Sequence, residues 1–148
     1  ARPRPRRRAP RPAGPLGAVV SRLGLERSVA FLGDVSDEVL AALYGGARLL
    51  IFPSRSEGFG LPVVEAMACG TPVVGARIPG VEDVTRGAAR LVPPGDPVAL
   101  AEAMRETIED EPARGELSRR GLARARDFDW DRSAASLLGV YRDVLGLS

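Results

Sequence analysis

Short apolar runs alternate with amphipathic stretches from residue 17 to the end of the chain. Apolar runs bounded by glycine, proline or acidic residues predict buried strands, and apolar residues at helical spacing predict helices. The predicted strands span residues 29–32, 49–53, 72–76 and 88–92. The predicted helices span residues 17–25, 37–44, 62–70, 97–108, 112–126 and 129–145. Strands that alternate with helices indicate an α/β fold with a Rossmann-like parallel sheet and flanking helices.

The ends of several predicted elements carry the residues that such ends favour. Ser36 and Asp96 stand where an N-cap side chain would accept backbone hydrogen bonds, and Pro62 and Pro97 suit the first helical positions. None of residues 49–53 has a polar side chain. This pattern predicts a parallel strand that is covered on both faces.

Composition excludes several kinds of chemistry. The 148 residues suffice for one domain with a core, and they include no histidine and a single cysteine, Cys69. Imidazole catalysis, histidine-ligated zinc, an internal disulfide framework and a multi-cysteine metal site are therefore excluded for this chain. No apolar run reaches the length of a membrane span, and no secretory signal is recognisable. We expect a cytoplasmic protein, whose full-length form could attach peripherally to a membrane.

The positive charge is concentrated at the start of the chain. Residues 1–12 hold six of the 21 arginines and none of the 19 acidic residues, and five prolines lie within residues 1–15. This composition predicts a disordered tail over residues 1–15 and a folded domain over residues 16–148. A solvated tail is the favoured interpretation. Binding to a polyproline-recognising groove and binding to nucleic acid stay open, although no aromatic residue for base stacking is interleaved.

Residues 54–61 are the strongest candidate for a binding loop. The loop follows an apolar strand and leads into the helix at Pro62, and ligands of open α/β sheets bind beyond the carboxyl ends of strands. Its glycines allow close backbone approach, and a helix N-terminus attracts phosphate. Glu57 and Glu65 could accept hydrogen bonds from sugar and ribose hydroxyls. From the residues alone, it is equally plausible that Glu57 is an ordinary surface acid and that Glu65 only complements the helix dipole.

A family resemblance favours the first interpretation. The motif EGFGLPVVEAMACGTPVV at residues 57–74, preceded by IFPS at residues 51–54, resembles the signature of retaining GT-B glycosyltransferases of family 4, the glycosyltransferases of group 1. Residues 31–36, 91–97 and 128–130 also match, so that the resemblance covers residues 14–145. It implies the C-terminal, donor-binding half of an enzyme that transfers a sugar from a nucleotide diphosphate sugar to an acceptor.

The resemblance also implies roles for individual residues. Glu57 would be the catalytic-site residue that contacts the donor sugar, and Glu65 would bind the ribose hydroxyls. The backbone of Gly58, Phe59 and Gly60 would face the sugar. The N–H groups near Leu61 and Val63 would bind the distal phosphate. Gly33 and Val35 would line the base. Enzymes of this kind are generally metal-independent, so we expect no metal site and no cofactor.

The sequence departs from the family pattern at its N-terminal side. The family's donor half normally begins with two further strands and an arginine/lysine pair that clamps the diphosphate, and this chain contains no lysine. We therefore expect that the first two strands and the N-terminal acceptor domain are missing, and that the chain alone has little or no transferase activity. The alternatives are a non-catalytic nucleotide-sugar-binding or regulatory module, and a protein that binds a partner through its arginine tail.

Three weaker signals lie outside this motif. Asp127, Asp129 and Asp131 form an Asp-x-Asp pattern, for which helix capping is favoured over metal binding because the pattern separates two helices. Trp130 and Tyr141 are predicted to be packing anchors of the last helix rather than sugar platforms. Arg55 could partly replace the missing diphosphate clamp, or it could be solvated or paired with Glu57.

Overall fold

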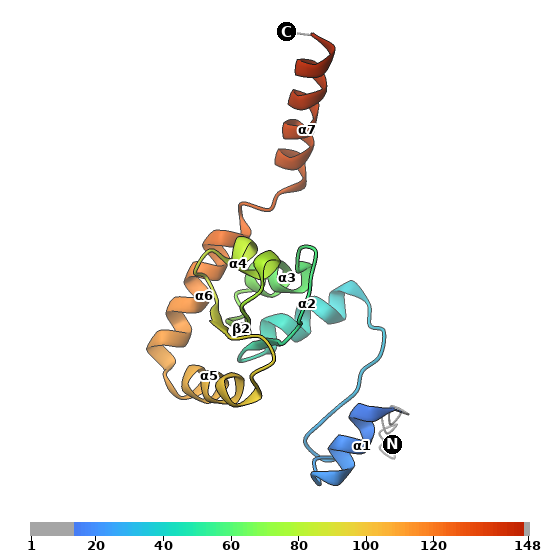
Figure 1. Cartoon of the computed structure of the whole chain (residues 1–148), viewed down its shortest axis with the longest axis vertical. Helices are drawn as coiled ribbons and strands as arrows, with labels where there is room; N and C mark the ends of the chain where they lie inside the picture. Colours follow the sequence, from blue (N-terminus) through green and yellow to red (C-terminus); the bar gives the residue numbers. More distant parts are fainter. Residues whose placement is uncertain (1–13, 147–148) are drawn as a thin grey trace, which may run out of the picture. The chain divides into compact units, whose positions relative to one another are not determined.

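The computed structural model describes residues 14–146, which divide into two compact units (Figure 1). The first unit extends to Asp37 and the second begins at Glu38. The expected tail at residues 1–15 lies almost wholly outside the described residues. Within the described chain, none of the helices has the combination of length and apolar content that a bilayer crossing would require.

In the first unit the structure contains one helix and an extended, exposed segment. Helix α1 (Pro15–Arg22) agrees with the helix predicted there. The predicted strand at residues 29–32 is wrong, because this segment has no regular structure and pairs with no strand among residues 14–146. Only Phe31 of these four residues is partly buried. An apolar run of this length forms a strand only when a neighbouring strand takes up its backbone hydrogen bonds.

The second unit alternates strands and helices. Its strands are β1 (Leu50–Phe52), β2 (Val73–Ala76) and β3 (Arg90–Val92). Its helices are α2 (Asp37–Gly46, whose first residue belongs to the first unit), α3 (Leu61–Ala68), α4 (Pro79–Thr85), α5 (Pro97–Glu109), α6 (Glu111–Ala125) and α7 (Trp130–Leu145). Helix α4 was not predicted, because seven residues that begin with Pro79 and Gly80 carry too little apolar periodicity.

The three strands form one parallel sheet in the order β1-β2-β3. Ile51 pairs with Val74, and Gly75 pairs with Leu91. This arrangement confirms an α/β fold with a parallel sheet and flanking helices. The central strand β2 is buried at all four positions, whereas β1 is only partly buried because it lies at the edge of the described sheet. The most apolar strand of the sequence is therefore not the most buried one.

Helices cover both faces of the sheet. On one face, Val63, Ala66 and Met67 of α3 form one core cluster with Val73, with Val84 of α4 and with the partly buried Leu50 and Phe52. On the other face, Val74 packs with Ala103 of α5 and with Leu49 and Ile51. The side chains of β1 thus alternate between two cores, as its uninterrupted apolar sequence predicts.

The last helix differs from the expectation. Helix α7 begins after Asp129, whose side chain accepts a hydrogen bond from the Arg132 N–H at 2.9 Å, so the predicted cap is confirmed. Trp130 is 85% exposed and Tyr141 is 56% exposed, and none of the helix's described residues is buried. Neither aromatic residue is therefore a packing anchor within the part of the chain that the structure describes.

Candidate functional site

The predicted binding loop leaves the carboxyl end of β1 and enters α3. Ser54, the second residue after β1, donates a hydrogen bond through its hydroxyl to Glu57 Oε1 at 2.7 Å. The same hydroxyl lies 3.1 Å from the carbonyl oxygen of Ser56. Glu57 is exposed, and Ser54 rather than Arg55 is its partner. The loop therefore holds an accessible carboxylate at the edge where α/β sheets bind ligands.

The start of α3 offers backbone N–H groups in this loop. Gly60 precedes the helix with φ +90°, a left-handed conformation that side chains rarely adopt. The Val63 N–H donates to the Gly60 carbonyl at 2.9 Å, whereas the Leu61 N–H has no acceptor among residues 14–146. One of the two predicted phosphate donors is thus available in this conformation, and the other is occupied by the helix cap.

Helix α4 approaches the loop closely from the other side. A Cβ atom on Gly80 would lie 2.9 Å from the Glu57 carbonyl oxygen and 3.4 Å from the Gly58 carbonyl oxygen. Only glycine permits this approach without displacement of the backbone. The backbone of α4 therefore approaches the loop closely at Gly80. A Cβ atom on Gly58, in contrast, would meet nothing within 4 Å.

An aromatic contact holds the apolar part of the loop. The Phe59 ring meets the Phe128 ring edge-to-face, with centroids 5.6 Å apart and an interplanar angle of 84°. The guanidinium carbon of Arg124 lies 4.6 Å from the centroid of Phe128. Arg124 is itself fixed, because its Nε and one terminal nitrogen donate to the carbonyl oxygens of Val84 and Asp83 at 2.7 and 2.9 Å. The ends of α4 and α6 thereby support the position of Phe59.

Glu65 lies on α3 and is exposed. The hydroxyl of Tyr44, on α2, donates a hydrogen bond to Glu65 Oε2 at 3.2 Å. Burial of Tyr44 raises the pKa of its phenol, and the Glu65 charge and hydrogen bond raise it further. Tyr44 therefore keeps its proton at neutral pH and acts as a donor towards the carboxylate.

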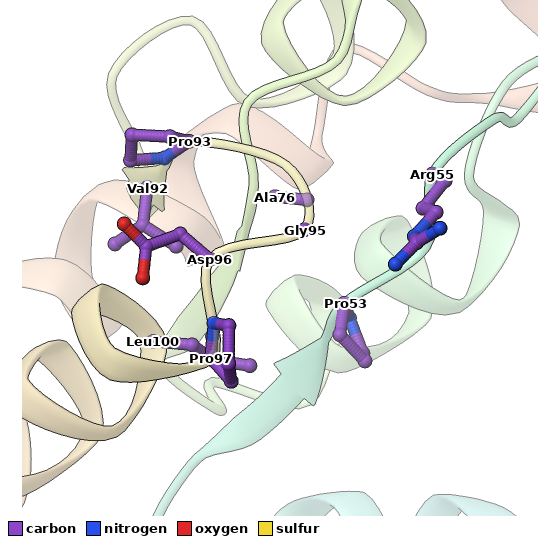
Figure 2. A pocket seen from close by; sticks show the side chains of 9 residues that line it. All are labelled: Pro53, Arg55, Ala76, Val92, Pro93, Gly95, Asp96, Pro97 and Leu100. Atoms are coloured by element: carbon purple, nitrogen blue, oxygen red, sulfur yellow. The ribbon is translucent and has the colours of Figure 1, made fainter.

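A cavity of about 270 Å³ opens at the carboxyl ends of all three strands (Figure 2). Ala76 and Val92, which end β2 and β3, contribute to its lining. Arg55 and Asp96 lie on opposite sides of it, and Asp96 Oδ1 caps α5 by accepting from the Val98 and Ala99 N–H groups at 3.0 Å. The cavity therefore borders the predicted loop through Arg55, but neither Glu57 nor Glu65 lines it.

The remaining predicted site residues lie in the first unit or outside the loop. Gly33 has φ +66° and Val35 is partly buried, and both belong to the first unit, so their role beside a base stays a prediction. Asp127 of the Asp-x-Asp pattern pairs with Arg124 at 2.6 Å. Among the described residues, no group of three or more acidic or cysteine side chains is placed to hold a metal ion.

Sequence reasoning did not find Tyr44, Gly80 and Phe128 as neighbours of the predicted loop and of α3. The contact between Tyr44 and Glu65 joins residues 21 positions apart, and no local pattern indicates it. A tyrosine on the apolar face of a helix does need a partner for its hydroxyl, which was the available signal for Tyr44. Gly80 and Phe128 gave no comparable signal.

Comparison with known proteins shows the family to which the chain belongs. The family model for glycosyl transferases group 1 matches residues 16–124. The O-antigen chain mannosyltransferase B of Escherichia coli is 35% identical over 127 residues, which are 86% of this chain and 33% of that protein. The D-inositol 3-phosphate glycosyltransferase of Acidothermus cellulolyticus is 40% identical over 132 residues, which are 88% of this chain and 29% of that protein. The chain thus spans about a third of the length of these curated relatives.

Solved structures show the same fold. A sucrose-phosphate synthase from Thermosynechococcus elongatus superposes with a TM-score of 0.82 and 33% identity, covering 90% of this chain and 34% of that chain. Anabaena HepE, solved in complex with UDP-glucose, superposes with a TM-score of 0.76 and 32% identity, covering 84% of this chain and 36% of that chain. The sheet and its flanking helices match the C-terminal Rossmann-like domain of GT-B glycosyltransferases.

Proposed function

Because the chain belongs to the glycosyl transferases of group 1, we propose that it is the donor-binding half of a retaining enzyme of family 4. The full-length enzyme would transfer a hexose from a nucleotide diphosphate sugar to an acceptor. The observation that carries the proposal is the placement of Glu57 and Glu65 around the loop that joins β1 to the start of α3. That Anabaena HepE was solved with UDP-glucose supports UDP as the first nucleotide to test.

In this proposal, the loop and helix α3 contact different parts of the donor. Glu57, positioned by the Ser54 hydroxyl, accepts hydrogen bonds from the sugar, and the backbone of residues 58–60 faces the ring. Glu65 accepts hydrogen bonds from the ribose. Carboxylates suit both tasks, since each oxygen accepts hydrogen bonds and a cis-diol offers two donors.

The leaving diphosphate requires stabilisation of its negative charge. The free Leu61 N–H and the N-terminal end of α3 supply a positive potential there, and Val63 would contribute if its N–H were released from Gly60. Arg55 is the nearest cationic side chain along the loop sequence and could add to this field. Preorganised donors of this kind usually give the largest part of the stabilisation of a developing charge. We propose that no metal ion or cofactor takes part.

Binding of nucleotides tests the proposal directly. Calorimetric titration with UDP, GDP and ADP should detect one that binds at millimolar concentration or below. Glu65→Ala should weaken that nucleotide by about tenfold or more, because a ligand hydroxyl loses a charged hydrogen-bond acceptor. Glu102→Ala, which removes an exposed glutamate on α5, is the matched control and should bind as the wild type does. Absence of binding by all three nucleotides would contradict the proposal.

Turnover separates catalysis from binding alone. We expect little or no sugar transfer by this chain with a nucleotide sugar and a simple acceptor, because the acceptor half of the family fold is not among the elements that the structure describes. Robust turnover by the chain would overturn this expectation. A non-catalytic nucleotide-sugar-binding module is the second candidate. It predicts the same binding, but no transfer by any longer form of the protein.

A further inference from the structure

Tyr44 makes one hydrogen bond with α3 and one with the segment that follows it. Its hydroxyl donates to Glu65 Oε2 at 3.2 Å, and its carbonyl oxygen accepts a hydrogen bond from the Thr71 hydroxyl at 2.5 Å. Thr71 follows the end of α3 and is only 2% exposed. The end of α2 is therefore tied both to the side of α3 and to the segment behind it.

The ring of Tyr44 gives this arrangement its rigidity. Tyr44 is partly buried and packs against the core cluster that contains Val63 and Ala66 of α3. Because these two residues flank Glu65 on the same helix, the ring and the carboxylate are held by one rigid element. Rotation of the ring away from Glu65 would expose apolar surface, which opposes such a movement.

The hydrogen bond to Glu65 orients the carboxylate and adds little stability. Its length exceeds the roughly 2.5–2.7 Å of a strong hydroxyl–carboxylate bond, so its energy is small. An exposed glutamate side chain otherwise samples several rotamers, and ordering it on binding costs free energy. Tyr44 occupies Oε2 and leaves Oε1 without a hydrogen bond from any of residues 14–146. Because Glu65 is exposed, its Oε1 is available to accept a hydrogen bond from a ligand.

We propose that Tyr44 is a positioning residue that aims the Glu65 carboxylate at the ribose diol of the donor, and so makes the site selective for ribonucleotides over 2′-deoxyribonucleotides. The inference rests on the proposed function, in which Glu65 binds the ribose. In this role Tyr44 acts through Glu65, to which its hydroxyl donates a hydrogen bond. Its effect is confined to the orientation of the Glu65 carboxylate before a ligand binds.

Tyr44→Phe removes the hydroxyl and keeps the ring in the core. For whichever of UDP, GDP and ADP binds wild type most tightly, the variant should bind about twofold to tenfold more weakly. Its affinity for the 2′-deoxy form of the same nucleotide should stay within twofold of the wild-type value. The preference for ribose should therefore shrink in the variant, because the lost interaction is made only with the diol.

Tyr141→Phe is the matched control, since it makes the same change at the other tyrosine, on α7. It should bind all these nucleotides as the wild type does. A purely structural role for Tyr44 would weaken the ribo and deoxy forms equally, and that result would overturn the inference. A thermal melt of each variant shows whether it is folded. If Tyr44→Phe does not fold, Thr71→Val, which releases the Tyr44 carbonyl, takes its place with Thr71→Ser as control and with the same outcomes.

The two proposals fail in different ways. If a nucleotide binds and Glu65→Ala weakens it while Tyr44→Phe behaves as Tyr141→Phe does, the inference is wrong and the proposed function stands. If UDP, GDP and ADP all fail to bind the wild type, the proposed function fails and the inference fails with it. An unchanged preference for ribose in Tyr44→Phe also contradicts the inference, whatever the absolute affinities.

Discussion

Tyr44 is the ionisable side chain whose environment in this site can be tested without a ligand. Its pKa is raised above the ordinary value of 10.0, first by burial and then by the negative charge of Glu65. A pKa that is raised in the folded state contributes stability that is fully present below the unfolded value. That stability is lost as pH rises from about 10 through the folded pKa. The free energy of unfolding should therefore decrease in this alkaline range, partly because Tyr44 ionises.

Absorbance at about 295 nm measures the ionisation of tyrosine. The chain has two tyrosines and one tryptophan, so the contribution of Tyr44 is obtained by comparison with Tyr44→Phe. The difference between the titration curves of wild type and Tyr44→Phe should show a midpoint above pH 10. The melting temperature of wild type should also fall more steeply than that of Tyr44→Phe as pH increases beyond 10. A difference curve with its midpoint at or below pH 10 would show that neither burial nor Glu65 acts on this hydroxyl.

At the residue scale, the sequence indicated candidate residues but not their contacts. Glu57 and Glu65 could be chosen because they flank a glycine-containing loop between an apolar strand and a proline-initiated helix. The partners of these carboxylates differ in how far they lie along the chain. Ser54 is three positions from Glu57, whereas Tyr44 is 21 positions from Glu65. The second contact depends on how α2 packs against α3, and no local pattern encodes that packing.

The crossing of α3 and α6 depends on a single small residue. Gly121 of α6 is buried, and a Cβ atom there would lie 3.2 Å from Met67 Cγ. Ser118, one turn earlier, donates to the Gly70 carbonyl at 2.6 Å and fixes the register of the two helices. Because Met67 is itself fully buried, it has little room to yield to a larger side chain.

Gly121→Leu should therefore lower the free energy of unfolding by about 1–3 kcal/mol through overpacking against Met67. Gly115→Leu makes the same change in the same helix at an exposed position where nothing lies within 4 Å. It should be neutral or slightly stabilising, since leucine favours a helix more than glycine does. Urea denaturation of both variants provides the comparison. Equal stability of the two would show that α3 and α6 do not cross at Gly121.

At the element scale, the helices predicted from caps and apolar periodicity were confirmed, whereas one short helix was missed and one short strand was wrong. Asp96 and Asp129 mark the starts of α5 and α7, because each accepts backbone hydrogen bonds from the first turn of its helix. Helix α4 escaped prediction since it spans only residues 79–85. The apolar run at residues 29–32 was wrongly predicted as a strand, because a strand also needs a neighbour that the sequence does not identify.

At the scale of the whole molecule, the class of fold followed from the alternation of elements, while burial did not. The parallel sheet and the helices on both of its faces agree with the prediction. Which strand is most buried depends on its place in the sheet, and β2 lies between the other two. The exposure of Trp130 on α7 likewise depends on what lies beside that helix, which a residue's apolar character does not specify.

The division into two units predicts where a protease cuts. Arg27 lies in the exposed segment that follows α1 and has no ion pair or hydrogen bond among residues 14–146. The arginines of the second unit between residues 77 and 124 lie in or beside packed elements, whereas Arg55 lies in the exposed loop between β1 and α3. Arg48 and Arg124 donate to backbone carbonyls, and Arg90 pairs with Glu106. Trypsin requires local unfolding around the bond it cleaves, so the packed arginines should resist it longer.

Mass spectrometry of a tryptic time course should show cleavage after Arg27 before any cleavage between residues 77 and 124. Arg27→Gln should remove that product and leave the later cuts at their original rates. Because the sheet and the core clusters lie beyond Glu38, the fragment that starts at Ser28 should still unfold cooperatively when heated. Cleavage at Arg90 or Arg124 as early as at Arg27 would mean that the second unit opens as readily as the segment before it. In that case the unit would not provide the rigid support that orientation of Glu57 and Glu65 requires.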